Sequence, residues 1–155
     1  MLFRSIYLPR VERAAGAVRP GPKAPLAALG SETILLVEDD DGLRQLARKI
    51  LQRNGYTVLE ARHGSEAEQI CREVENPIHL VLTDVVMPGI GGPELVRRLA
   101  LLKPTVKVLY MSGYTDQTIL QHGLLEMSAC FLQKPFTPTS LARKVREVLD
   151  SPASE

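Results

Sequence analysis

The stretch Leu80-Val81-Leu82-Thr83-Asp84, which continues as Val85-Val86-Met87-Pro88-Gly89, decides the fold of this chain. It is an apolar run that ends in a carboxylate and leads into a loop with proline and glycine. Open α/β sheets place their chemistry at such a strand end. In the same way, Ile34–Val37 leads into the acidic run Glu38–Asp41, and a later apolar run is followed by Lys134-Pro135. Carboxylates and a lysine at three strand ends indicate a divalent-cation site for phosphoryl chemistry.

From Thr33 onward, short apolar runs alternate with stretches of helical periodicity. The runs expected to be strands are Ile34–Val37, Tyr56–Leu59, Leu80–Thr83, Val106–Met111 and Cys130–Leu132. Most are apolar at every position, as parallel strands covered on both faces are. Five strands in strict alternation with five helices predict an α/β fold with a doubly wound, five-stranded parallel sheet of the flavodoxin-like (βα)5 class. Right-handed crossovers, with two helices on one face and three on the other, favour the strand order 2-1-3-4-5.

The helical stretches carry an apolar stripe with i, i+3, i+4, i+7 spacing. In the first, the stripe consists of Leu43, Leu46, Ala47, Ile50 and Leu51, and Asn54-Gly55 is its stop signal. In the second it consists of Ala67, Ile70, Cys71 and Val74, with Ser65 as the predicted N-cap and Glu68 at the capping-box position. The third has Pro93 in its first turn and is expected to bury Leu95, Val96, Leu99 and Leu102. A weaker fourth helix is expected from about Thr115 to Leu125, and a fifth from about Thr139 to Leu149.

Composition and charge exclude several classes of protein. The chain is 45% hydrophobic and 24% charged, which is ordinary for a globular domain. Residues 33–155 are slightly acidic in sum, which gives no reason to expect nucleic-acid binding. No apolar stretch approaches the roughly 18 residues of a membrane helix, so neither a membrane span nor secretion is expected. Cys71 and Cys130 have no CxxC spacing, so buried free thiols in a reducing cytosol are expected instead of a zinc site.

The chain divides into an arm, a domain and a short tail. Residues 1–32 contain a region rich in proline, glycine and alanine without apolar periodicity, and are predicted to be a disordered or linker arm. Residues 33–150 form the predicted domain, and residues 151–155 are a tail.

The predicted strand order gathers the polar residues of different strand ends into one crevice. Hard oxygen ligands favour Mg²⁺, which relieves the repulsion between neighbouring carboxylates. Asp84 could then act as a nucleophile, Lys134 would neutralise an incoming phosphoryl group, and Ser112 would donate a hydrogen bond to it. Each residue alone has a simpler explanation: the acidic run complements a helix dipole, Ser112 and Asp84 belong to turns, and Lys134 is solvated. Four such explanations together account poorly for the order in which these residues occur.

These motifs resemble a two-component receiver domain over residues 33 to about 150. Glu38-Asp39 is similar to the acidic pair, Asp84-Val-Val-Met87-Pro88-Gly89 to the phosphoacceptor loop, Met111-Ser112-Gly113 to the hydroxyl position, and Lys134-Pro135-Phe136 to the lysine with its usually cis proline. The resemblance implies that Asp84 accepts phosphate from a phosphohistidine. It implies that Asp39, Asp84 and the Val86 carbonyl ligate Mg²⁺, with Glu38 reaching the metal through water. Ser112 and Phe131 would form the switch pair.

Two positions that flank the path of an attacking water in this family hold bulky residues here. They are Val86 and Tyr114, and neither carries a carboxylate or amide that could orient the water. We therefore expect a comparatively long-lived acyl phosphate.

A second resemblance concerns the amino terminus. Residues 2–10 resemble the closing strand of a histidine-kinase ATP-binding domain, and such a strand, a linker and a receiver resemble the C-terminal part of a hybrid sensor kinase. The alternative is an arm without function. His63, His79 and His122 are not followed by an acidic residue, as the phosphorylated histidine of a kinase usually is, and are interpreted as structural or surface residues. No P-loop or ATP-lid motif is present, so ATP binding is not expected.

The predicted function is a phosphoacceptor receiver that switches conformation, not an enzyme beyond its own phosphotransfer and slow dephosphorylation. The expected partners are a histidine kinase or a histidine phosphotransfer protein, in the cytoplasm, with a possible homodimer through the face of helix four, strand five and helix five. The main alternative is a Mg²⁺-dependent aspartate-nucleophile phosphohydrolase, which needs a second aspartate where Val86 stands. A DNA-binding regulator and a partner-binding receiver without phosphorylation are further alternatives.

Overall fold

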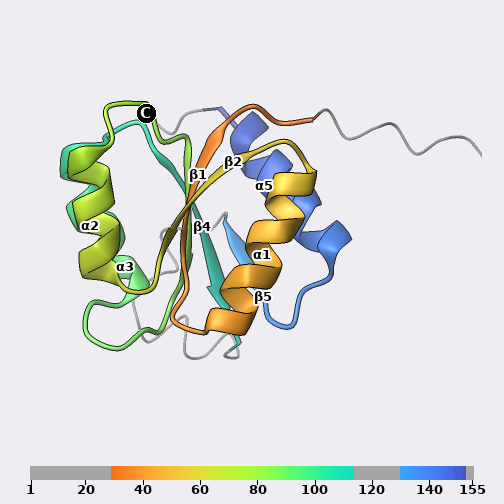
Figure 1. The fold of residues 1–155 in the computed structure, drawn as a ribbon, viewed down its shortest axis with the longest axis horizontal. Coiled ribbons are helices and arrows are strands. Elements are labelled where there is room, and N and C mark those ends of the chain that lie inside the picture. The colour runs from red at the N-terminus through yellow and green to blue at the C-terminus, as the bar shows by residue number, and fades with distance from the viewer. Residues whose placement is uncertain (1–28, 114–129, 153–155) are drawn as a thin grey trace, which may run out of the picture.

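Five parallel strands form one sheet in the order β2-β1-β3-β4-β5, as the sequence predicts (Figure 1). The computed structural model describes residues 29–113 and 130–152. The strands are β1 (Thr33–Val37), β2 (Thr57–Ala61), β3 (Leu80–Asp84), β4 (Lys107–Ser112) and β5 (Phe131–Gln133). Parallel pairing brings the carboxyl ends of all five strands to one edge of the sheet.

Helices cover both faces of the sheet. Those described are α1 (Asp41–Arg53), α2 (Gly64–Glu73), α3 (Gly92–Leu102) and α5 (Pro138–Asp150). Figure 1 shows α1 and α5 on one side of the strands, and α2 and α3 on the other. The helix expected at residues 115–125 lies outside the described residues.

Alternate residues of each central strand enter two separate cores. Ile34 and Leu36 of β1 pack with residues of α1 and α5, whereas Leu35 and Val37 pack with residues of α2 and α3. Because successive side chains of a strand point to opposite faces, both faces must be apolar. This explains why the strands read as unbroken apolar runs in the sequence.

Several local predictions were wrong. The second, fourth and fifth strands begin one residue later than predicted, at Thr57, Lys107 and Phe131. The N-cap of α2 is His63, whose Nδ1 accepts a hydrogen bond from the backbone of Glu66, so Ser65 is not the cap. Leu46 and Leu102 are exposed, at 47% and 38%. Leu46 therefore lies on the outer side of α1, and Leu102 is the last residue of α3. Cys130 is half-buried and only Cys71 is buried.

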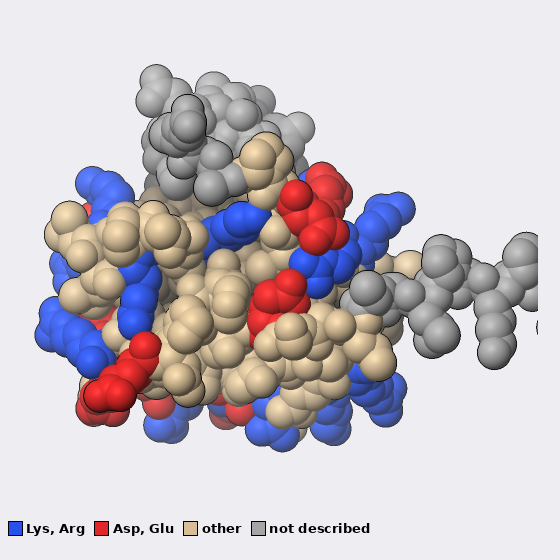
Figure 2. All heavy atoms as spheres, turned by 90° about the horizontal axis from the view of Figure 1, so that it is seen from above, with Lys and Arg blue, Asp and Glu red and all other residues tan. Residues whose placement is uncertain are grey.

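The described helices give no membrane span, and one face of the molecule has mixed charge. No helix in the described part of the chain has both the length and the apolar character needed to cross a bilayer. Figure 2 views the molecule from the top of Figure 1, and acidic and basic side chains are interspersed on this face.

The residues just before β1 are tied to the last helix. The Arg146 guanidinium of α5 donates to both carboxylate oxygens of Glu32, at 2.8 and 3.3 Å, and also to Asp150. The hydrogen bond from Arg146 is the main cause that lowers the pKa of Glu32 from 4.5 to about 2. The predicted domain boundary at Thr33 therefore falls just after a segment that packs on the domain.

Replacing Glu32 with glutamine is expected to lower the free energy of unfolding by about 1 kcal/mol at neutral pH. A lowered folded-state pKa means that the ionised carboxylate stabilises the fold above pH 4.5. This contribution is lost as the pH falls from 4.5 through about 2, so the two proteins should become equal there. Urea unfolding at both ends of this range measures the difference. Glu147→Gln, which breaks an exposed pair with Lys144, is the control and should change little. An E32Q effect that does not depend on pH would contradict the prediction.

Candidate phosphoacceptor and cation site

The end of β1 presents two carboxylates in different surroundings. Glu38 is 1% exposed, and its backbone N–H donates to the carbonyl of Ala61 at the end of β2. Asp39 follows it and is exposed. Asp40 is the N-cap of α1, where its side chain accepts from the backbone N–H of Leu43 at 2.7 Å. The acidic run thus divides into two carboxylates at the strand end, a helix cap, and Asp41 in the first turn of α1.

Asp84 ends β3, directly beside β1. Its side chain is 13% exposed, and Oδ1 accepts a hydrogen bond from the backbone N–H of Val86 at 3.3 Å. The loop then returns so closely that a Cβ on Gly92 would lie 2.3 Å from the carbonyl oxygen of Asp84. Only glycine allows this approach, and it starts α3 directly behind the strand end.

Lys134 bridges the carboxylates of the two strands. Its Nζ donates to Glu38 Oε2 at 2.8 Å and to Asp84 Oδ2 at 2.9 Å. The backbone N–H of Lys134 donates to the carbonyl of Ser112, which fixes β5 against β4, and the Lys134-Pro135 peptide is cis. Lys134 therefore meets Glu38 and Asp84, which lie 96 and 50 positions before it in the sequence.

Burial and ion pairing have opposite effects on the pKa values of Glu38 and Lys134. Burial is the main influence on Glu38 and raises its pKa above 4.5, although the hydrogen bond from Lys134 acts against it. For Lys134, burial lowers the pKa, but the hydrogen bonds to Glu38 and Asp84 outweigh burial and raise it above 10.5. The site therefore holds a buried carboxylate whose charge is costly and an ammonium that stays charged.

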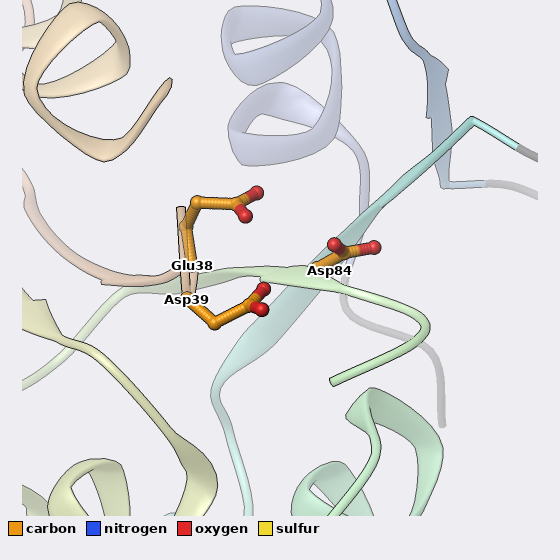
Figure 3. Close-up of side chains that lie close together, drawn as sticks. All are labelled: Glu38, Asp39 and Asp84. Carbon is orange, nitrogen blue, oxygen red and sulfur yellow. The ribbon is translucent and has the colours of Figure 1, made fainter. Parts of the chain in front are cut away.

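Three carboxylates could hold a metal ion. One oxygen each from Glu38, Asp39 and Asp84 lie within 4.8 Å of one another. Figure 3 shows Glu38 and Asp39 side by side at the end of β1, and Asp84 on the neighbouring strand. They line an open cavity of about 440 Å³ together with other residues, namely Asp40, Leu43, Val86, Gly113 and Lys134. Hard oxygen donors in an open cavity suit Mg²⁺, which keeps part of its water shell.

Comparison with known proteins assigns the chain to one family. Residues 34–146 match the family described as the response regulator receiver domain. The chain belongs to this receiver family. Its role is therefore that of a phosphoacceptor receiver in two-component signal transduction. Receiver domains bind Mg²⁺ through acidic residues and interact with histidine kinases or histidine phosphotransfer proteins.

The relatives include both stand-alone receivers and parts of larger proteins. The chain is 40% identical over 121 residues to the sensor kinase CckA of Brucella abortus (strain 2308), and the match covers 78% of this chain but only 13% of that protein. It is 34% identical over 116 residues to the response regulator receiver protein CpdR of the same organism, covering 75% and 95% of the two chains. The crystal structure of the receiver domain from the hybrid histidine kinase CckA has a TM-score of 0.64 and 37% identity, covering 76% and 99%.

The two residues of the expected switch pair lie on adjacent strands of this receiver. Ser112 is buried at the end of β4, and Phe131 begins β5. The Phe131 ring stacks on Tyr110, with ring centroids 5.4 Å apart. Burial raises the pKa of Tyr110 to about 12, so this phenol stays neutral. Tyr114, the second residue expected to flank the attacking water, lies outside the described residues.

Sequence reasoning missed Arg44 of α1. Its side chain is 10% exposed, and it lies on the buried stripe with Ala47, Ile50 and Leu51. The spacing of three and seven residues from Arg44 to Ala47 and Leu51 is a signal that could have revealed it. An arginine at a core-facing position of a helix indicates buried acceptors, and these are the strand end and loop beneath it.

Proposed function

We propose that Asp84 is the residue that takes the phosphoryl group from a phosphohistidine of a partner, in a Mg²⁺-dependent reaction. The observation that carries this assignment is the bridge from Lys134 to Asp84 and Glu38, which places an ammonium beside the carboxylate that would react. An oxygen of Asp84 would bond to phosphorus while the P–N bond breaks and its electron pair returns to the imidazole.

The other residues are assigned by what they can do at this place. Glu38, Asp39, Asp84 and the Val86 carbonyl would hold Mg²⁺, which when bound neutralises charge on the phosphoryl oxygens. Lys134 would turn from Glu38 and Asp84 to the phosphoryl group. Ser112 and Phe131 would move together once a phosphoryl group is present, which shifts the population between two conformations.

Several wider assignments rest on the sequence and the relatives. A hybrid kinase containing this receiver is supported by the similarity to CckA and by residues 2–10, which lie outside the described part. A homodimer through residues 115–125, β5 and α5, the cytoplasmic location, the absence of other enzymatic activity and the absence of nucleic-acid binding remain predictions.

The direct test is phosphate uptake by the full chain from acetyl phosphate, with and without Mg²⁺, followed by intact-protein mass spectrometry. We expect one phosphoryl group per chain, in an acyl phosphate that hydroxylamine removes, and only with Mg²⁺. No uptake from acetyl phosphate or from any phosphorylated histidine kinase would contradict the proposal. Steady turnover of phosphomonoesters would instead favour the phosphohydrolase.

The lifetime of the phosphorylated form follows from the same experiment. Val86 is exposed at the cavity and offers no hydrogen-bonding side chain to orient an attacking water. After the phosphodonor is removed at saturating Mg²⁺, we expect the phosphoryl group to persist well beyond a few seconds. Val86→Asn, which adds an amide at this position, should shorten the lifetime. Loss of phosphate from the unchanged protein within a few seconds would contradict this.

A further inference from the structure

Arg44 of α1 contacts the loop that carries Glu38 and Asp39, two of the proposed cation ligands. Its Nη1 donates to the carbonyl of Glu38 at 2.8 Å, and its Nη2 donates to the carboxylate of Asp41. Its Nε lies 3.6 Å from the carboxylate of Glu60 on β2. A buried guanidinium brings five N–H donors that need acceptors. The two hydrogen bonds reach the end of β1 and the start of α1, and the ion pair reaches β2, so Arg44 links these three elements.

The contact with Glu38 completes a set of hydrogen bonds around this one residue. The N–H of Glu38 donates to Ala61, its carbonyl accepts from Arg44, and its side chain accepts from the N–H of Asp40 at 3.1 Å. That carbonyl belongs to the peptide that joins Glu38 to Asp39. Asp39 is exposed, so the packing of its side chain does little to place it, and the backbone sets where its side chain begins.

We infer that Arg44 is a positioning residue for the cation site. It holds the peptide between Glu38 and Asp39 so that both carboxylates stay within reach of Asp84. The inference rests on the proposed Mg²⁺ site. It assigns Arg44 no contact with the cation or the phosphoryl group.

The positioning role and the charge of Arg44 predict opposite effects of its loss on Mg²⁺ affinity. A guanidinium near three carboxylates opposes the binding of another cation, so loss of its charge alone would tighten Mg²⁺ binding. Loss of the bond to the Glu38 carbonyl would weaken it, because the ligands would have to be reordered on binding. Arg44→Lys keeps the charge but not the planar fork, whereas Arg44→Met removes both.

The experiment is isothermal titration of the full chain with Mg²⁺, after far-UV circular dichroism has checked that each variant is folded. We expect Mg²⁺ affinity to fall by about tenfold in R44K. It should fall by less in R44M, because the loss of the positive charge offsets part of the effect. Arg48→Met is the matched control: Arg48 lies one turn further along α1 and binds Glu60 at 2.8 Å, but no described contact joins it to the loop. R48M should bind Mg²⁺ within about twofold of the unchanged protein.

A second readout separates positioning from a general loss of structure. At saturating Mg²⁺, R44K should take up phosphate as fast as the unchanged protein, since its ligands are intact. R44K with unchanged affinity, or R44M with tighter binding, would overturn the inference. If the unchanged protein itself bound no Mg²⁺, the proposed cation site would fail instead, so the two failures are distinguishable. Should R44M not fold, R44K alone decides the outcome.

Discussion

Replacing Asp84 with asparagine is expected to reduce phosphate uptake to the level of a reaction without protein. The amide is nearly the same size as the carboxylate but has lost the anionic oxygen that would attack phosphorus. Lys134 keeps its hydrogen bond to Glu38, and the amide can still accept from Lys134 through its oxygen. The fold should therefore survive. Intact-protein mass spectrometry after incubation with acetyl phosphate and Mg²⁺ measures the result.

Asp40→Asn is the matched control for this experiment. Asp40 also lines the cavity, but its side chain caps α1, and asparagine is as good an N-cap as aspartate. D40N should therefore take up phosphate much as the unchanged protein does. Uptake by D84N at a rate near that of D40N would assign the phosphoacceptor to another residue, and peptide mapping after borohydride reduction would identify it.

The sheet order and the convergence of the site follow from the sequence because both depend on patterns that the backbone enforces. Unbroken apolar runs require parallel strands covered on both faces, and the strand order then puts the ends of β1 and β3 side by side. Glu38, Asp84 and Lys134 do meet there. The roles assigned to these residues come from the family resemblance and are tested only by the experiments above.

Two of the wrong predictions, those for Leu46 and Ser65, have a common physical cause. Leu46 and Arg44 both lie next to core positions of α1, and hydrophobicity alone favours Leu46 for the core. The structure buries Arg44 instead, because the end of β1 offers a carbonyl and Asp41 a carboxylate to its guanidinium. Similarly, His63 replaces Ser65 as the cap of α2, since an unprotonated imidazole nitrogen can accept the same hydrogen bond. Such choices depend on tertiary acceptors that a helical pattern does not contain.

The contacts of Lys134 in this structure also differ from those that the sequence predicts. The lysine was expected to meet an incoming phosphoryl group, whereas here it bridges two carboxylates. Its ammonium thus neutralises two of the carboxylates that a bound cation would also neutralise. Lys134 therefore has a role in stability as well as in the proposed chemistry, and the two can be separated by experiment.

Replacing Lys134 with methionine is expected to lower the free energy of unfolding by about 3 kcal/mol at neutral pH without Mg²⁺, because removing one partner of a buried pair leaves uncompensated charge. Glu38 is 1% exposed and would lose the cation that now lowers its pKa. A pKa raised in the folded state means that the ionised carboxylate opposes folding at higher pH. The deficit should therefore shrink as the pH falls toward 4.5, because Glu38, whose pKa lies above 4.5, becomes protonated over this range and its charge no longer needs a partner.

Urea unfolding of K134M without Mg²⁺ measures this loss of stability. The same measurement with Mg²⁺ shows how much stability the bound cation restores. A ligand that binds only the folded state stabilises it in proportion to its affinity. Since K134M keeps all three carboxylates and no longer has the competing ammonium, Mg²⁺ should stabilise it more than it stabilises the unchanged protein. Lys144→Met, which breaks a pair with the exposed Glu147, should cost less than about 1 kcal/mol and gain nothing extra from Mg²⁺. If K134M were as stable as K144M without Mg²⁺, the ammonium would not offset the charge of Glu38 and Asp84.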